Sequence, residues 1–399
     1  MANTILTPTK VTRKALMILH QKLAFIGTID RQYDSSFAVD GAKIGSQLKI
    51  RLPNKYITGV GTDITPQDTT ENSETLTVAT QRHVPMSFLA SELTLSLDDF
   101  SERILDPAMS VMAAVTERDA FNMFLEVYQQ VGTPGSSPNA LLTFLQAGAR
   151  LDNSLAPRSN RAIQLPPLDS ATLIDALKGL FNDTTAISKQ YRDGIMGRTA
   201  GFDWYSNTLT ARMTNGNKVT GVTVSGASQV GSSIVFGGVA NLDTFKKGQV
   251  FTMAGCFEIH PETKEATGRL QKFVVTADTT SSTTTVTVPI EPAINVTATG
   301  QQTVSASPTN GGAVVFDGTA SLVYDIIGTY YKNAFAFVTA DLLMPKGVHF
   351  SSREVLDGIS MRIVSQYAVL SDKIVTRVDI LYGYKAIRRE LACRVASGT

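Results

Sequence analysis

The middle of the chain, from residue 213 to residue 293, has the composition of β-structure alone, and this constrains the fold more than any other feature. Thr, Val, Gly and Ser dominate there, and the turn-forming sequence TNGN lies at its start. The flanking segments carry helical patterns as well as strands. Because the helical patterns disappear completely in this segment and return after it, the sequence predicts an all-β domain inserted into an α+β host.

The strands of this segment are clearest in residues 247–275. Gly255 lies inside one apolar row, and a glycine in a strand usually marks a bulge or a close backbone approach. The polar sequence HPETKEATG follows, and Phe273 and Val275 then resume the alternation. We therefore expect two strands joined by a long polar loop. Large apolar side chains occupy odd positions of the first strand, as one face requires: Phe251, Met253, Phe257 and Ile259.

The repeated pattern also predicts how the inserted domain is closed. About five or six such strands can form a small barrel, which removes the exposed edges of an inserted sheet. The ends of the insertion, near Met213 and Ala293, are expected to lie close together because the host chain must continue across them. A domain of this size is expected to fold by itself.

The host is predicted to contain both helices and long strands. Residues 7–25 have the pattern of a helix, and residues 42–85 have that of two strands joined by a polar loop. Residues 106–132 are predicted as one helix of about 25 residues, roughly 37 Å long, with Asp and Gly at its ends. Further expectations are helices at 169–181 and 319–337, and strands at 360–370 and 373–386.

The bulk composition fits a folded protein without a membrane span. The chain has 43% hydrophobic and 18% charged residues, a balance that excludes disorder along its whole length. Its two cysteines, Cys256 and Cys393, provide no disulfide framework. No apolar run approaches the roughly 18 residues of a transmembrane helix, and the apolar run near the N-terminus lacks the cleavage site of a signal peptide.

Positive charge is concentrated in the first 60 residues, which hold nine Lys or Arg against three Asp. A basic arm of this kind can meet nucleic acid or an acidic partner surface. The alternative is a solvated amphipathic segment, because the basic residues do not form a dense block. Both interpretations stay open at this stage.

Motifs that would indicate an enzyme are absent from the sequence. It contains no phosphate-binding loop, no dinucleotide-binding glycine motif and no nucleophile elbow. His260 and Glu262 imitate a zinc-deaminase motif, but that chemistry also needs a Cys-x-x-Cys pair, which the chain lacks. Two groups of acids could be taken for catalytic residues, namely Asp98 with Asp99 and the sequence ERD at 117–119. Charges at helix starts and on helix surfaces are the better explanation for them. We expect no catalytic residue, no metal site and no cofactor.

Several long stretches resemble one family of phage proteins. They include TKVTRKALMILHQKLAF and GAKIGSQLKIRLPNKY near the start, KKGQVFTMAGCFEIHPETKEATGRLQKFVVTAD in the β segment, and RVDILYGYKAIRRELACRV at the end. In these stretches the chain resembles the coat-protein family of the short-tailed phage P-22, whose members have the Hong Kong 97-like capsid fold. The resemblance covers nearly the whole chain.

The resemblance implies an α+β fold in seven successive parts. Family members can carry a long charged loop in the inserted domain that contacts neighbouring capsomers. Here the corresponding stretch is short and bears only Asp243, so no such contact is expected. The parts are an N-arm (1–41), an extended loop (42–85), a peripheral domain with a spine helix (86–135), the first part of an axial domain (136–212), the inserted barrel-like β domain (213–293), the second part of the axial domain (294–345) and the C-terminal strands of the peripheral domain (346–399).

The function implied by the resemblance is that of a major capsid protein of a tailed bacteriophage. Its copies would form hexamers and pentamers of an icosahedral shell that encloses packaged dsDNA, which it would contact without sequence specificity. A portal and a separate scaffolding protein are the expected partners, the latter because the chain starts directly with the arm. The protein would reside in the virion, would be assembled in the host cytoplasm, and would have no membrane partner.

The residues expected to make contacts during assembly lie in the loop and the arm. In the loop they are Arg51, Lys55 and Tyr56, and in the arm they are Lys10, Arg13 and Lys14. Some shells of this fold join a loop lysine covalently to an asparagine of the neighbouring peripheral domain. Residues 346–399 contain no asparagine, so no such bond is expected.

Three other functions compete with this interpretation. An encapsulin-like compartment shell would have the same fold but would enclose a cargo enzyme. A phage surface or tail decoration protein would explain the Thr-rich and Ser-rich β texture, although not a long spine helix. An unrecognised hydrolase would have to use the acids at 98–99 or 117–119.

Overall fold

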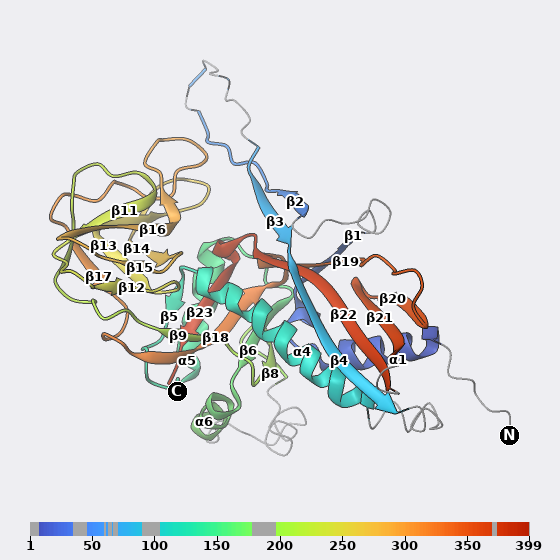
Figure 1. Cartoon of the computed structure of the whole chain (residues 1–399). Helices are drawn as coiled ribbons and strands as arrows, with labels where there is room; N and C mark the ends of the chain where they lie inside the picture. The colour runs from blue at the N-terminus through green and yellow to red at the C-terminus, as the bar shows by residue number, and fades with distance from the viewer. Residues whose placement is uncertain are drawn as a thin grey trace. The chain divides into compact units, whose positions relative to one another are not determined.

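The computed structural model describes most of the chain (Figure 1). The chain forms two compact units, and each is considered by itself. The first unit consists of Met1–Ile50, Glu74–Phe121 and Phe335–Ile387, and the second of Arg51–Ser73, Asn122–Ala334 and Arg388–Thr399. The described residues are 8–34, 46–59, 61–62, 66, 71–89, 104–177, 197–368 and 373–398.

A six-stranded sheet forms the centre of the first unit, in the order β1-β19-β22-β21-β20, with β4 also paired to β22. β1 pairs with β19 in parallel, and the other pairs are antiparallel. β21 and β22 confirm the two C-terminal strands predicted from alternation. The strands are β1 (Asp30–Asp34), β4 (Thr80–Leu89), β19 (Phe335–Ala340), β20 (Phe350–Leu356), β21 (Ile359–Ala368) and β22 (Lys373–Ala386).

The alternation in β22 shows how this sheet forms its core. Even-numbered side chains such as Val378 and Tyr382 are buried, whereas Lys373 and Val375 are exposed on the other face. Helix α4 (Asp106–Phe121) packs on the buried face, where the Tyr382 hydroxyl donates to its Asp119. Helix α1 (Pro8–Lys22) packs in turn on α4 and on β20.

Helix α4 is shorter than the sequence pattern predicts. It ends at Phe121, and a 3₁₀ segment, η4 (Asn122–Glu126), follows it in place of a helix continuing to residue 132. The apolar stripe does continue, but Phe124 belongs to the core of the second unit, where its ring lies 5.6 Å from that of Tyr330. The spacing of apolar residues does not show whether they pack in the core of the first unit or of the second. The predicted helix length, which followed the apolar spacing to residue 132, was therefore wrong.

The two strands predicted around the extended loop are present. β2 (Ser46–Arg51) and β3 (Ser73–Val78) pair with each other as a two-stranded sheet, and β3 is followed almost directly by β4. Leu76 and Val78 of β3 are buried and anchor it to the first unit. Most of the expected polar tip, residues 60, 63–65 and 67–70, lies outside the described residues.

A seven-stranded sheet forms one part of the second unit, in the order β5-β23-β18-β6-β8-β7, with β9 paired to β18. Helix α5 (Leu141–Asn153) packs on β23 and β5, and α6 (Pro167–Leu177) follows β6. The strands are β5 (Gln130–Val131), β6 (Arg161–Leu165), β7 (Arg198–Thr199), β8 (Phe202–Ser206), β9 (Arg212–Thr214), β18 (Val323–Tyr331) and β23 (Ala392–Ala396).

The helix expected at 319–337 is not present. Strand β18 runs through this segment, and the short 3₁₀ turn η6 (Lys332–Ala334) and strand β19 follow it. From Ile326 to Tyr330 every residue of β18 is buried, so the strand shows no alternation by which to recognise it. Its enrichment in Ile, Thr and Tyr was the better guide, because these residues favour strands.

Six strands of the second unit close on themselves as a barrel, in the order β10-β11-β16-β14-β13-β17. All six pairs are antiparallel, and the last strand returns to the first. Five phenylalanine rings fill the interior together with valine and isoleucine side chains. The strands are β10 (Val222–Val224), β11 (Gly231–Gly237), β13 (Val250–Ile259), β14 (Ala266–Val275), β16 (Thr285–Ile294) and β17 (Ala313–Phe316). The closed barrel predicted from alternating strands is therefore present.

Gly255 produces a bulge in β13, as its position in the strand pattern predicts. It adopts a φ of +82°, and the pairing of β13 with β14 shifts between Thr252 and Phe257. Beyond the bulge the facing of the side chains is reversed, so that Cys256 is buried and Phe257 is 36% exposed. The expectation that Phe257 shares a face with Phe251 was therefore wrong, because the extra residue moves it to the outside.

The barrel ends later in the sequence than residue 293. Strand β17 closes it between β10 and β13, so residues 313–316 belong to the barrel and not to the following domain. The boundary at Ala293 was wrong because β17 is only four residues long and lies among Gly, Ser and Thr. The two connections do lie side by side: Thr214 of β9 is opposite Val323 of β18, and the Asn215 N–H donates to the Leu322 carbonyl at 2.9 Å.

Candidate assembly surfaces

Helix α1 presents three basic side chains on one face. Val11, Ala15 and Leu19 are buried, as the helical spacing predicts. Lys10, Arg13 and Lys14 are exposed, and Arg13 and Lys14 follow Lys10 by three and four residues, which places the three on one side of the helix. The structure therefore brings together all three arm residues expected to make assembly contacts. Their ammonium and guanidinium groups are suited to phosphate or carboxylate acceptors.

A buried carboxylate fixes the chain that follows α1. Glu117 of α4 is 1% exposed, and its two oxygens accept the backbone N–H groups of Phe25 at 3.0 Å and Ile26 at 3.1 Å. These N–H groups lie at the start of the 3₁₀ turn η1 (Ile26–Thr28), where a helix of any kind leaves donors unpaired. Glu117 is therefore a structural tie between the arm and the spine helix.

Asp119, the other acid of the ERD sequence, has a structural role as well. Its Oδ2 accepts from Arg82 Nη2 at 2.8 Å and from the Tyr382 hydroxyl at 2.7 Å. Burial raises the pKa of Tyr382, so its hydroxyl keeps the proton that it donates. Asp119 therefore joins β4, β22 and α4, and neither acid of this pair is free to act as a catalytic base. Asp98 and Asp99 lie outside the described residues.

An ion-pair cluster ties the end of α1 to the turn between β20 and β21. Asp357 Oδ2 lies 2.9 Å from His20 Nε2 and 2.6 Å from Arg31 Nη2. Hydrogen bonding from His20, and then the charge and hydrogen bond of Arg31, lower the pKa of Asp357. The cluster is half-exposed, so its main effect is to orient the turn.

The base of the extended loop holds the other three residues expected to make assembly contacts. Arg51 is largely exposed and lies 3.7 Å from Glu71 across the two strands. Beyond it the Leu52 N–H donates to the Asn72 carbonyl at 2.8 Å, which continues the ladder by one residue. Lys55 and Tyr56 follow and are both exposed. The structure places all three on one short segment.

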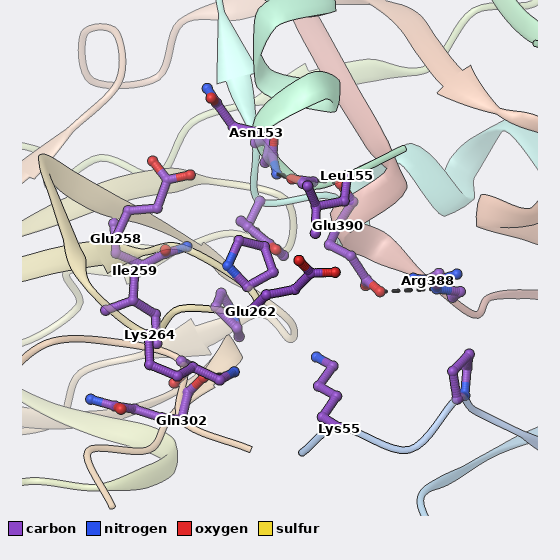
Figure 2. A pocket seen from close by; sticks show the side chains of 18 of the residues that line it. Lys55, Asn153, Leu155, Glu258, Ile259, Glu262, Lys264, Gln302, Arg388 and Glu390 are labelled. Carbon is purple, nitrogen blue, oxygen red and sulfur yellow. Dashed lines mark hydrogen bonds and ion pairs between the residues drawn. The ribbon is translucent and has the colours of Figure 1, made fainter. Parts of the chain in front are cut away.

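A cavity of about 580 Å³ lies beside this segment in the second unit. Its wall includes Lys55 and Tyr56 of the loop base, the C-terminal end of α5, the outside of the barrel, and residues next to η7 (Arg389–Leu391). Figure 2 shows Lys55 and Lys264 reaching towards the cavity from two sides, with Glu262 beside them. The cavity size is typical of a site for a small ligand or for an inserted side chain.

Most charges on the cavity wall are paired. Glu258 accepts from both Arg150 at 3.2 Å and Arg269 at 3.3 Å. Arg388 lies 3.0 Å from Glu390, which is drawn as a dashed line in Figure 2. Lys272 lies 2.6 Å from Asp317. These pairs fix the wall and, within the described ranges of the chain, leave the Lys55 and Lys264 ammonium groups as the cations aimed at the cavity.

The remaining candidates for chemistry have ordinary structural roles. His260 lies in the β13–β14 turn, where its Nδ1 accepts the N–H groups of Glu262 at 3.3 Å and Thr263 at 3.2 Å. Burial raises the pKa of the Cys256 thiol to about 11 and that of Cys393 to about 12. In the described part of the chain no three His, Cys, Asp or Glu side chains come together to hold a metal ion. Likewise, none of the described helices is long and apolar enough to cross a membrane.

Three features of these surfaces were missed at the level of sequence. Glu117 lies on the apolar stripe of its helix, four residues before Phe121, and a carboxylate in that position is itself a sign of a buried partner. Lys264 gives no sequence signal, because only the folded barrel brings it close to Lys55. The His20 and Asp357 pair, 337 residues apart, is likewise a product of tertiary structure alone.

Comparison with known proteins gives a family match over most of the chain. The family model described as "P22 coat protein - gene protein 5" matches residues 20–395. No curated protein sequence matches the chain. Similar solved structures include Mycobacterium phage Che8 (TM-score 0.46, 10% identity, 94% of this chain and 90% of that one) and the capsid of Ralstonia phage GP4 (TM-score 0.45, 7% identity, 95% and 92%). A virus-like particle from Pyrococcus furiosus is also similar (TM-score 0.41, 8% identity, 97% and 97%).

Proposed function

This chain belongs to the P22 coat protein family, and we propose from that premise which of its surfaces build the shell. It is a major capsid protein of a tailed phage, and its copies form the capsid. Its α+β fold is the Hong Kong 97-like fold of such proteins. The family match over residues 20–395 is the single observation that carries this conclusion.

The extended loop is proposed to contact a neighbouring subunit through Arg51, Lys55 and Tyr56. In support, the three side chains are exposed on one segment, and the contact of Arg51 with Glu71 is long, at 3.7 Å. Closed shells need many repeated contacts, for which a projecting loop is well suited. Charge reversal of Arg51 and Lys55 should lower the yield of shells and leave thermal unfolding of the monomer unchanged. An equal loss of monomer stability would contradict this role.

The basic face of α1 is proposed to contact the scaffolding protein or packaged dsDNA inside the shell. Sequence-independent attraction to phosphates needs only exposed cations such as Lys10, Arg13 and Lys14, and it weakens steeply with salt. Reversing all three charges should reduce the retention of DNA or scaffold at low salt. A salt dependence identical to that of the unchanged protein would exclude the arm as the contact.

The division into capsid domains is proposed with changed boundaries. The first unit contains the arm helix, the spine helix and strands β20 to β22, as expected for an N-arm and a peripheral domain. We assign β19 to the peripheral domain as well, because it pairs with β22, and β23 to the axial domain, because it pairs with β18. The second unit contains the sheet assigned to the axial domain and the barrel. We extend the inserted domain from residue 293 to about residue 322, because β17 completes the barrel and the stem follows it.

The protein is proposed to act without catalysis, to reside in the virion after assembly in the host cytoplasm, and to have a portal as a partner. Family and fold are those of structural capsid proteins. An encapsulin-like shell is the main alternative, since it would have the same fold. Electron microscopy of the purified protein, followed by analysis of the shell contents, tests both. Closed shells containing dsDNA support the proposal, shells containing a cargo enzyme support the alternative, and a stable monomer with enzymatic turnover contradicts both.

A further inference from the structure

The wall of the cavity carries more positive than negative side chains. Basic residues outnumber acidic ones on the wall by five to three. One of the three acids, Glu258, also pairs with the guanidinium of Arg269, which is not among the five. A concave surface with an excess of one charge concentrates ions of the opposite sign. The cavity is therefore suited to an anion. The basic residues are Lys55, Arg150, Lys264, Lys272 and Arg388, and the acidic residues are Glu258, Glu262 and Glu390.

The excess charge is localised on Lys55 and Lys264. Arg150, Lys272 and Arg388 each have a carboxylate partner within 3.2 Å. No ion pair links Lys55 or Lys264 to a carboxylate anywhere in the described ranges. Lys264 instead donates to two backbone carbonyls, those of Gly300 at 2.8 Å and Gln302 at 3.5 Å. Neutral acceptors of this kind fix the position of the ammonium group without balancing its charge.

The backbone holds the two lysines close together before any ligand arrives. At Gly300 a Cβ atom would come within 2.1 Å of the Lys55 carbonyl oxygen, so only glycine permits this approach. The same glycine accepts the Lys264 hydrogen bond. Lys264 itself has a φ of +60°, the left-handed conformation, within the turn between β13 and β14. Such preorganisation lowers the cost of ligand binding.

Two ammonium groups placed in this way repel each other. Burial first, and the charge of Lys55 second, lower the pKa of Lys264. An oxyanion between the two groups would relieve both effects, because it supplies the negative charge that the wall lacks. We propose that this cavity is an oxyanion site, in which Lys55 and Lys264 together bind one carboxylate or phosphate group.

The cavity also indicates what carries the oxyanion. Its volume of about 580 Å³ exceeds the space of a bare phosphate ion, and Tyr56, Leu155 and Pro261 add apolar surface to the wall. An acidic side chain from a neighbouring copy, or a small organic phosphate, satisfies both features. The shared chemistry is the oxyanion, and the two sources are distinguished below. Because Lys55 is also a proposed contact of the extended loop, this site deepens the proposed shell function and rests on it where a neighbouring copy supplies the carboxylate. Phosphate binding to the unassembled chain tests the site separately from shell formation.

Binding to the unassembled full-length chain is tested with inorganic phosphate. Titration calorimetry should detect one site in the unchanged protein, and Lys55→Met with Lys264→Met together should weaken the affinity at least 100-fold. Lys332→Met removes an exposed ammonium group outside the cavity and should change nothing. Glu262→Gln should tighten binding, because it removes a competing carboxylate beside the two lysines. Absence of binding to the unchanged protein, or equal binding to the double variant, overturns the proposal.

A second measurement keeps the test valid if Lys264→Met fails to fold. Lys264→Arg keeps the charge and should retain phosphate binding in a folded protein. In the unchanged protein, NMR of methylated lysines should show the pKa of Lys264 rising when phosphate is added, because an anion stabilises the ammonium form. A Lys264 pKa that is insensitive to phosphate contradicts the proposal.

Assembled shells distinguish the two sources of the oxyanion. If a neighbouring copy supplies a carboxylate, Lys264 should be protected from amine-reactive labels in shells without phosphate, and added phosphate should change nothing. If the ligand is free in solution, protection should appear only when phosphate is added. Labelling of Lys264 that is equal in monomers and shells, with and without phosphate, overturns the site while leaving the capsid function intact.

Discussion

The barrel and the first unit are stabilised by different kinds of contact. Inside the barrel, Phe236 lies 5.3 Å from Phe251 and 5.9 Å from Phe316, ring centre to ring centre, within a cluster of buried apolar side chains. In the first unit the segment after α1 is held by the buried carboxylate of Glu117 and by the ion pairs of Asp357. Apolar burial is non-directional, whereas each of these polar contacts specifies one arrangement of the arm.

This difference predicts that the barrel folds without the rest of the chain, whereas the position of the arm depends on a few specific polar contacts. A closed sheet with its own core needs nothing from the rest of the chain. The arm also buries apolar side chains such as Phe25, whose ring lies 5.0 Å from that of Phe121. Its arrangement depends in addition on particular donors and acceptors that face each other, and an unpaired buried group is costly. The following predictions test this contrast, beginning with the largest expected effect.

Removing one strand of the barrel should abolish its independent folding. Residues 212–325 contain all six strands and the stem, and we expect them to fold alone and to melt cooperatively. Residues 213–293 lack β17 and would leave β10 and β13 with open edges, so they should remain largely unfolded. Circular dichroism and amide NMR of both segments provide the measurement. A well-dispersed spectrum for the shorter segment would show that β17 is dispensable.

Shortening a central ring should destabilise the barrel by about 3–5 kcal/mol. Phe236→Ala removes a fully buried side chain that contacts three other rings. Phe257→Ala is the matched control, since Phe257 is 36% exposed on the outside, and it should cost far less. Hydrogen exchange of barrel amides in the full chain measures both changes. Similar losses in the two variants would contradict the assignment of inside and outside at the bulge.

Removing the arm's buried acceptor should destabilise the segment after α1 by about 2–4 kcal/mol, because two backbone donors lose their partner. The variant is Glu117→Ala, and the readout is hydrogen exchange of Phe25 and Ile26. Arg118→Ala, on the exposed side of the same helix, is the control. Exchange in the barrel should be unaffected by either change. A loss of protection that spreads equally to the barrel would mean that the two regions are not independent.

The smallest effect is expected from Asp357 at low pH. Its pKa is lowered in the folded protein, so its contribution to stability is present above the ordinary pKa of about 3.9. That contribution should be lost as the pH falls from about 4 through the lowered value. Asp357→Asn should remove this part of the acid sensitivity and leave stability at neutral pH almost unchanged, since the group is half-exposed. Unfolding curves between about pH 2 and pH 7 test the difference.

Regular features of the fold were predictable from local patterns. The alternation in residues 247–275 indicated the barrel strands, and Gly255 indicated the bulge. The spacing of Val11, Ala15 and Leu19 indicated the arm helix. In each case one face of the element is buried and the other is not, so the spacing of apolar residues indicates the type of secondary structure.

Other features depend on information that no local pattern contains. β18 is buried on both faces, and its sequence therefore lacks the alternation of a strand. The stripe on α4 continues into residues that belong to another core. The cavity beside Lys55 combines residues from four distant parts of the chain, and its unbalanced charge exists only after folding. The six proposed contact residues were visible as exposed charge and polarity, but the partners that we propose for them belong to other molecules and leave no pattern in this sequence.

The stem of the barrel has a consequence for the host sheet. Because Thr214 of β9 faces Val323 of β18 in an antiparallel ladder, the chain on either side already has the geometry of a β-hairpin. A two-residue Asn-Gly turn has the right twist to join these strands directly. The whole barrel is thus a replaceable part: a short turn can close the gap that it leaves, and a foreign domain with adjacent termini can take its position without disturbing β18.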